Sequence, residues 1–168
     1  NFENKNLNIE KIRKESLDQL LYLFNKAQEQ NLTLGLEPIG SWEILKKGHF
    51  NSISSCLNLV KKYEHKLIID LYHSFADTKL ESFLKNSSKL GLLQFSNIKF
   101  DNNWRPTGRL ILNKQNNLNN VDISKYLKTV LNRKDRINVE FEIFQSDIKD
   151  ADPKLVITNL KKEILELL

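Results

Sequence analysis

The chain has 168 residues, of which 40% are hydrophobic and 28% charged, with a formal net charge of +5. These values are typical of one globular domain with a core of its own, and no apolar run reaches the ~18–20 residues of a membrane span. The basic residues occur as scattered pairs rather than in one block, which argues against a nucleic-acid surface despite the positive charge.

Cys56 is the single cysteine, so an internal disulfide is excluded. A lone cysteine fits a reducing, cytoplasmic location and is most often a small core residue. We treat residues 1–168 as a single domain, in which residues 1–8 form a flexible or disordered tail.

Helical and strand patterns alternate along the chain. After a helix over residues 9–30, short apolar runs predict strands over residues 32–38, 66–73, 91–100 and 136–144. Each strand is followed by a segment with helical spacing, and these lie at residues 52–64, 77–90, 122–134 and 152–168. Residues 101–120 are polar and predict a long loop with a turn around Thr107. This α/β order indicates parallel (βα) units with right-handed crossovers.

Polar side chains stand where the predicted strands end, and the carboxyl ends of parallel strands share one edge of the sheet. These side chains belong to Glu37, Asp70, Gln94 and Glu142. Three carboxylates and one amide carbonyl form an oxygen-only set, which suits Mg²⁺ or Mn²⁺ better than a thiolate-type zinc site. Glu140 shares a strand face with Glu142 and remains an alternative ligand.

Further side chains lie next to this predicted edge. His73 follows Asp70 closely and is suited to contact a substrate oxygen or to move a proton. Glu43 lies in the loop after Glu37, and Trp42 and Trp104 are candidate walls of a sugar-sized pocket. Each residue alone is more typical of a helix cap, a surface charge or a structural histidine, and only the coincidence of positions favours a functional site.

Four segments resemble, in order, the second half of the xylose isomerase-like TIM barrels. They read "GLEPIGSWE", "IIDLYHS", "LLQFSN…WRPTG" and "VEFEIF". This superfamily includes sugar isomerases, ketose 3-epimerases, hydroxypyruvate isomerases, inosose dehydratases and endonuclease IV. The resemblance implies that the chain corresponds to strands 5–8 of a (β/α)8 barrel. The barrel's first four strands have no counterpart here, so it also implies a missing N-terminal half-barrel or a homodimer.

The resemblance assigns roles to individual residues. Glu37 and Glu142 match residues that bind the metal and move protons, with Glu140 as the fallback for Glu142. Asp70 and Gln94 match the other metal ligands. The substrate contacts implied are those of His73, Glu43 and Arg105. Endonuclease IV needs more histidines at its zinc site than this chain contains, which argues against DNA repair.

The resemblance therefore implies a metal-dependent isomerase or epimerase that acts on a small sugar or hydroxy-carbonyl compound. Proton transfer would pass through an enediolate stabilised by Mn²⁺, Mg²⁺ or Co²⁺. Activity is implied only if a complete barrel forms. Two alternatives stay open: a catalytically inactive half-barrel or interaction module, and a dehydratase of the inosose type.

Overall fold

A computed structural model describes residues 8–43, 50–112, 121–148 and 151–167. Most of the tail expected over residues 1–8 lies outside this part, and so does His49. Asn8 is described, and its side chain accepts a hydrogen bond from the backbone N–H of Lys11 at 3.0 Å, which caps the first helix. No helix in the described ranges combines the length and the apolar character needed to cross a bilayer.

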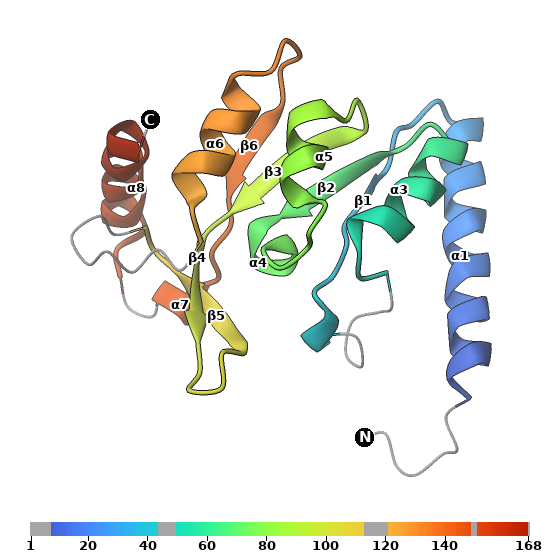
Figure 1. Cartoon of the computed structure of the whole chain (residues 1–168), viewed down its shortest axis with the longest axis horizontal. Helices are drawn as coiled ribbons and strands as arrows, with labels where there is room; N and C mark the ends of the chain where they lie inside the picture. The colour runs from blue at the N-terminus through green and yellow to red at the C-terminus, as the bar shows by residue number, and fades with distance from the viewer. Residues whose placement is uncertain (1–7, 44–49, 113–120, 149–150, 168) are drawn as a thin grey trace.

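The centre of the protein is a parallel sheet with the strand order β1-β2-β3-β6. Its strands are β1 (Gly35–Leu36), β2 (Lys66–Asp70), β3 (Leu90–Phe95) and β6 (Asn138–Phe141). Neighbouring strands are connected through helices, so the expected α/β class with parallel (βα) units is confirmed. Figure 1 shows α1 at one end of the row of elements and α8 at the other.

The helices follow the predicted order, with short additions next to the site. They are α1 (Ile9–Glu29), η1 (Ser41–Glu43), α3 (Ile53–Lys62), α4 (Leu71–Ser74), α5 (Leu80–Asn86), α6 (Ile123–Leu131), α7 (Gln145–Ile148) and α8 (Pro153–Leu167). The helices α3, α4 and α6 begin at capping side chains. An oxygen of Ser52, Asp70 or Asp122, respectively, accepts a backbone N–H of the first turn.

The two faces of the sheet differ in burial. On β2, Leu67 and Ile69 have no exposed surface and belong to the core shared with the helices, while Ile68 on the other face is half-buried. Cys56 of α3 is fully buried in the same core. Such alternation is typical of a strand that is covered on one side only. Within this chain, the face that would line the inside of a barrel is incompletely covered.

The prediction of a loop over residues 101–120 is wrong for residues 106–110, which form a strand. An antiparallel hairpin is formed by β4 (Asn97–Phe100) and β5 (Pro106–Leu110), and it extends beyond the carboxyl end of β3 (Figure 1). The chain reverses between Asp101 and Arg105 rather than around Thr107, since the Asp101 N–H bonds the Arg105 carbonyl. Residues 113–120 of the predicted loop lie outside the described ranges.

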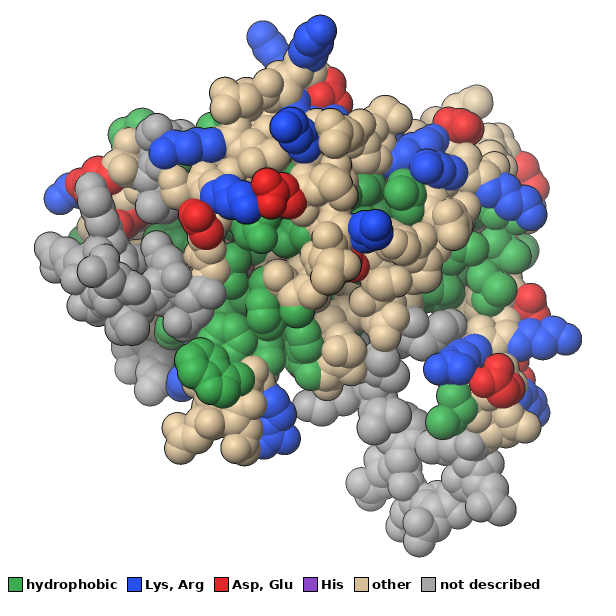
Figure 2. Space-filling view, in the orientation of Figure 1, with side chains coloured by type: hydrophobic (Ala, Val, Ile, Leu, Met, Phe, Trp, Pro, Cys, Tyr) green, Lys and Arg blue, Asp and Glu red, His purple; other side chains and the backbone are tan. Residues whose placement is uncertain are grey.

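Basic side chains are dispersed on the face shown in Figure 2, where Lys and Arg are interleaved with acidic and uncharged groups. Several basic side chains of the described residues are held in ion pairs, such as Lys125 with Glu81 at 2.6 Å and Lys89 with Glu64 at 2.7 Å. On this face, the basic side chains are thus spread out rather than gathered into one patch.

Candidate functional site

Strand register brings polar residues into one row at the carboxyl edge of the sheet. Asp70 on β2 pairs in register with Gln94 on β3, and Gln94 pairs with Glu140 on β6. Glu142 lies two residues beyond Glu140, and its backbone N–H bonds the Phe95 carbonyl at 3.0 Å. With Glu37 directly after β1, all four strand-end residues predicted from the sequence lie along this edge.

Asp70 links the sheet to α4. Its Oδ1 accepts the backbone N–H of Tyr72 at 2.9 Å, and its Oδ2 accepts a hydrogen bond from Arg109 Nη2 at 2.6 Å. The strand predicted over residues 66–73 is therefore wrong beyond Asp70, because that carboxylate starts a helical turn. Burial raises the pKa of Asp70 to about 6, although the nearby Arg109 charge acts in the opposite direction.

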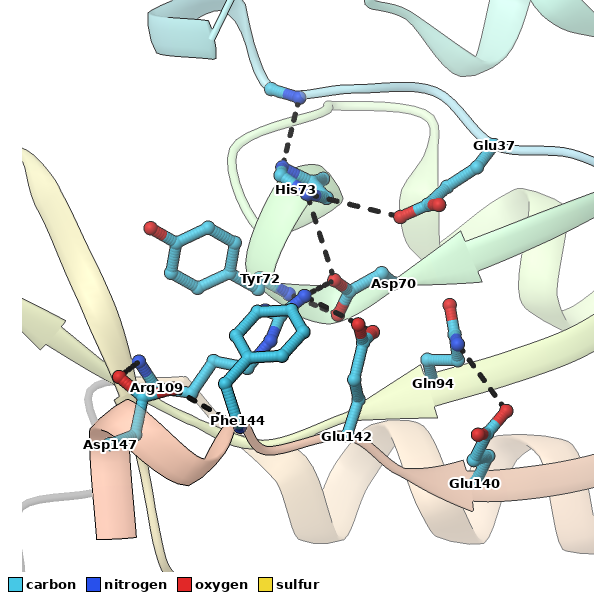
Figure 3. A network of polar contacts seen from close by, with 11 residues as sticks. Glu37, Asp70, Tyr72, His73, Gln94, Arg109, Glu140, Glu142, Phe144 and Asp147 are labelled. Carbon is cyan, nitrogen blue, oxygen red and sulfur yellow. Dashed lines mark hydrogen bonds and ion pairs between the residues drawn. The ribbon is translucent and has the colours of Figure 1, made fainter. Parts of the chain in front are cut away.

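Arg109 enters the site from β5, and the sequence analysis missed it. Its Nη2 also lies 3.1 Å from Glu142 Oε2, so one guanidinium joins two carboxylates (Figure 3). The Arg109 Cζ lies 4.4 Å from the ring centroid of Tyr72 and 5.1 Å from that of Phe144. Its Nε and Nη1 are buried and have no hydrogen-bond partner among the described residues.

A small residue and an aspartate fix the strand that carries Arg109. The Arg109 backbone N–H approaches Asp147 Oδ1 at 3.4 Å, and the same carboxylate accepts the Phe144 N–H at 3.2 Å. A Cβ on Gly108 would lie 3.0 Å from Asp147 Oδ1, so a larger residue would press on this contact. The alternation of β5 places Arg109 inward, but its pairing with β4 could not be read from the polar sequence around it.

His73 is buried, and its hydrogen bonding defines its tautomer. Nδ1 accepts the backbone N–H of Gly40 at 3.2 Å, so the neutral ring carries its proton on Nε2. Nε2 lies 3.9 Å from Glu37 Oε1 and 3.9 Å from Asp70 Oδ2. The Trp42 ring stacks on the imidazole, with centroids 6.3 Å apart and planes inclined by 27°. In this tautomer Nε2 donates a proton rather than a lone pair.

Glu37, Asp70 and His73 form a group whose potential ligand atoms all lie within 4.8 Å of one another. Because His73 presents Nε2–H, the oxygen atoms of the site suit a cation better than this histidine does. Gln94 donates from Nε2 to Glu140 Oε2 at 3.3 Å, and its Oε1 points away from Glu140 (Figure 3). That Oε1 is buried without a hydrogen-bond partner among the described residues, so it is an acceptor that remains unused.

The charges of this site favour a divalent cation. When Glu37, Asp70 and Glu142 are ionised, three negative charges face the one positive charge of Arg109. Hard divalent ions prefer carboxylate and carbonyl oxygens, which are the donor types present here. The excess negative charge and the unused Gln94 carbonyl therefore fit such an ion.

The structure separates the remaining predicted residues. Glu43 ends η1, and its negative charge helps to raise the pKa of Tyr72, after the larger effect of burial. Arg105 lies outside the network, because its side chain is 69% exposed and pairs with Asp101 at 3.1 Å. Trp104 is 77% exposed at the tip of the hairpin, whereas Trp42 stacks on His73 within the site.

No model of a known protein family matches the sequence, and no curated protein sequence matches it. Solved structures do share its fold. IolI, solved with a bound zinc atom, has 18% identity and a TM-score of 0.70, with 98% of this chain and 59% of that chain covered. The 3-keto-D-glucoside 4-epimerase YcjR of E. coli has 17% identity and a TM-score of 0.64, with 98% and 56% covered.

A third similar structure is a xylose isomerase domain-containing protein from Salmonella typhimurium, with 16% identity and a TM-score of 0.66. The match covers 87% of this chain and 54% of that chain. At these identities the likeness concerns the fold. The chain has the fold of the xylose isomerase-like TIM barrels, and it spans little more than half the length of the solved structures that it matches.

Proposed function

We propose that this chain supplies the acidic half of a barrel enzyme that moves a proton on a carbon next to a carbonyl group. The substrate class is a small sugar or hydroxy-carbonyl compound, and the reaction is isomerisation or epimerisation. One observation carries the proposal: Glu37, Asp70 and Glu142 gather around His73 and Arg109 at the carboxyl edge of a parallel sheet. The sugar epimerase among the similar structures supports the same class.

A divalent cation, Mn²⁺, Mg²⁺ or Co²⁺, would be held by oxygens of Glu37, Asp70, Gln94 and Glu142. When bound, such an ion supplies a Lewis acid that polarises a carbonyl and offsets the negative charge of the carboxylates. The zinc atom in IolI shows that a protein of this fold binds a metal. The choice among the ions is part of the proposal.

Side chains of this protein would carry out the proton transfer and hold the substrate. Glu142 and Glu37 come from the two ends of the row of strands, which suits them to remove and return a proton on different sides of a substrate carbon. The His73 Nε2–H would donate to a substrate oxygen, and the Gly40 N–H keeps the imidazole in that tautomer. Arg109 takes the place that the sequence analysis gave to Arg105, and Glu43 remains a proposed substrate contact.

A second half-barrel completes this proposal. The sheet ends at β1 and β6 within the described residues, and Ile68 on its inner face is only half-buried. Parallel sheets are normally covered on both faces, so a further (βα) segment or a second copy would protect this face. The same observation favours a second candidate function, an inactive half-barrel that serves as an interaction module. We also propose a cytoplasmic location for the protein. A dehydratase reaction of the inosose type stays an alternative to isomerisation or epimerisation.

Deuterium exchange tests the central step without knowledge of the final product. The full-length protein would be incubated in D₂O with Mn²⁺ and a panel of ketoses, hydroxy-ketones and inososes, and deuterium at the carbon next to the carbonyl would be followed by NMR. We expect exchange in wild type and a loss of about 10²-fold or more in Glu142→Gln. Absence of exchange for every compound would contradict the enzyme and favour the interaction module.

A further inference from the structure

We propose that Arg109 is a built-in substitute for the divalent ion, and that ion binding displaces its guanidinium so that it can contact the substrate. This inference rests on the proposed metal site. It adds an order of events: the ion must bind before the substrate does. Arg109 would thus couple occupation of the metal site to readiness of the substrate site.

The guanidinium of Arg109 and a bound ion would use the same oxygens. Arg109 Nη2 lies 2.6 Å from Asp70 Oδ2 and 3.1 Å from Glu142 Oε2. Asp70 Oδ1 is already held by the Tyr72 N–H at 2.9 Å, so Oδ2 is the oxygen of Asp70 left to meet an ion. Two cations at these oxygens would repel each other, and the repulsion is poorly screened in a buried site. Binding of an ion there would therefore favour displacement of the guanidinium.

Arg109 also leaves hydrogen-bond donors unused. Its side chain is 3% exposed, yet Nε and Nη1 have no hydrogen-bond partner among the described residues. A buried arginine with a purely structural role normally satisfies its donors, since a buried polar group without a hydrogen-bond partner destabilises the fold. In its observed position, the Arg109 guanidinium therefore lacks, within the described part of the chain, the hydrogen-bond acceptors that a permanent structural role would require. Oxygens of a sugar or hydroxy-carbonyl compound would supply the missing acceptors.

The surroundings of Arg109 allow its guanidinium to shift within its own plane. The ring faces of Tyr72 and Phe144 lie 4.4 and 5.1 Å from Cζ, and stacking of this kind fixes a plane more than a position within it. Phe144 is 50% exposed, so this wall borders solvent. Meanwhile Asp147 binds the Arg109 backbone, which keeps β5 in place as the side chain moves.

Two measurements on the 168-residue chain test displacement without any substrate. In the first, Mn²⁺ binding is followed by electron paramagnetic resonance in wild type, Arg109→Met and Arg105→Met. The Arg105 variant removes the same charge from the same hairpin but outside the site. We expect Arg109→Met to bind Mn²⁺ about tenfold or more tightly than wild type, and Arg105→Met to stay within about twofold.

The second measurement uses wild type alone, so it does not depend on the folding of a variant. Phenylglyoxal labelling of Arg109 is quantified by mass spectrometry with and without saturating Mn²⁺, and we expect labelling to rise severalfold with the ion. Equal Mn²⁺ affinities in wild type and Arg109→Met would overturn the inference, as would unchanged labelling or no Mn²⁺ binding in any variant. Failure of the deuterium-exchange test would leave these results intact, because no turnover is measured here.

Discussion

The guanidinium of Arg109 donates to the carboxylate of Asp70 at 2.6 Å, and both side chains are buried, with 3% and 0% of their surface exposed. The two residues are 39 positions apart and come from different sheets. This pair connects the β4–β5 hairpin to the parallel sheet at the edge where the acidic side chains meet. Its energetics and its chemistry are accessible to direct tests.

Loss of one partner should destabilise the protein strongly. A buried charge without its partner costs about 3–5 kcal/mol, so Arg109→Met should lower the free energy of unfolding by that order. Arg105→Met serves as the control, because its ion pair with Asp101 is 69% and 29% exposed and is expected to contribute little to stability. Urea unfolding followed by circular dichroism measures both changes. Equal losses in the two variants would contradict the structural role of the Asp70–Arg109 pair.

The pH dependence of stability should carry the signature of Asp70. Burial raises the pKa of Asp70 from 3.8 to about 6, so the folded state holds this proton more tightly than the unfolded chain does. The contribution of Asp70 is therefore most favourable below about pH 4, falls as the pH rises to about 6, and is constant above that. Unfolding free energies of wild type and Asp70→Asn would be compared from pH 3.5 to 7.5.

Relative to Asp70→Asn, the unfolding free energy of wild type should fall by about 3 kcal/mol as the pH rises from the lower to the upper end of this range. The other carboxylates titrate in both proteins, so the difference between the two curves isolates Asp70. A difference that moves in the opposite direction with pH would show that the Arg109 charge, rather than burial, dominates the pKa of this group.

His73 should matter for turnover more than for metal binding. Its Nδ1 accepts the Gly40 N–H, so Nε2 carries a proton and cannot offer a lone pair to an ion. We expect His73→Gln to change the Mn²⁺ dissociation constant by less than about threefold. The same substitution should lower the rate of deuterium exchange at the substrate carbon next to the carbonyl by about 10²-fold or more. Isothermal titration and NMR exchange measure the two quantities. A large loss of Mn²⁺ affinity would instead make His73 a ligand in the opposite tautomer.

A matched pair of substitutions separates Glu142 from Glu140. Glu142 Oε2 shares the Arg109 guanidinium with Asp70, whereas Glu140 is exposed and bonds Gln94. Glu142→Gln should weaken Mn²⁺ binding by about tenfold or more, because a ligand charge is lost, and Glu140→Gln should change it by less than about threefold. Calorimetric titration of both variants provides the comparison. The reverse ranking would make Glu140 the ligand.

The periodic pattern of apolar residues carried the prediction of the (βα) order, and the structure confirms it. The strand-end positions of Glu37, Asp70, Gln94 and Glu142 followed from the same pattern, since a parallel sheet places all carboxyl ends at one edge. Whether these residues bind a metal remains a prediction. The strand predicted over residues 66–73 extends past the observed end of β2, because the pattern of apolar residues does not reveal that Asp70 caps a helical turn.

The alternation of strands and helices and the acidic character of one sheet edge could be predicted from the sequence, because both depend on residue type at short, regular spacing. By contrast, the entry of Arg109 rather than Arg105 into this edge follows from the folded β4–β5 hairpin. Hairpin pairing depends on hydrogen bonds between β4 and β5 and on the turn at Asp101, which lie in a polar stretch without periodicity. Likewise, the tautomer of His73 follows from a backbone N–H that lies 33 residues away.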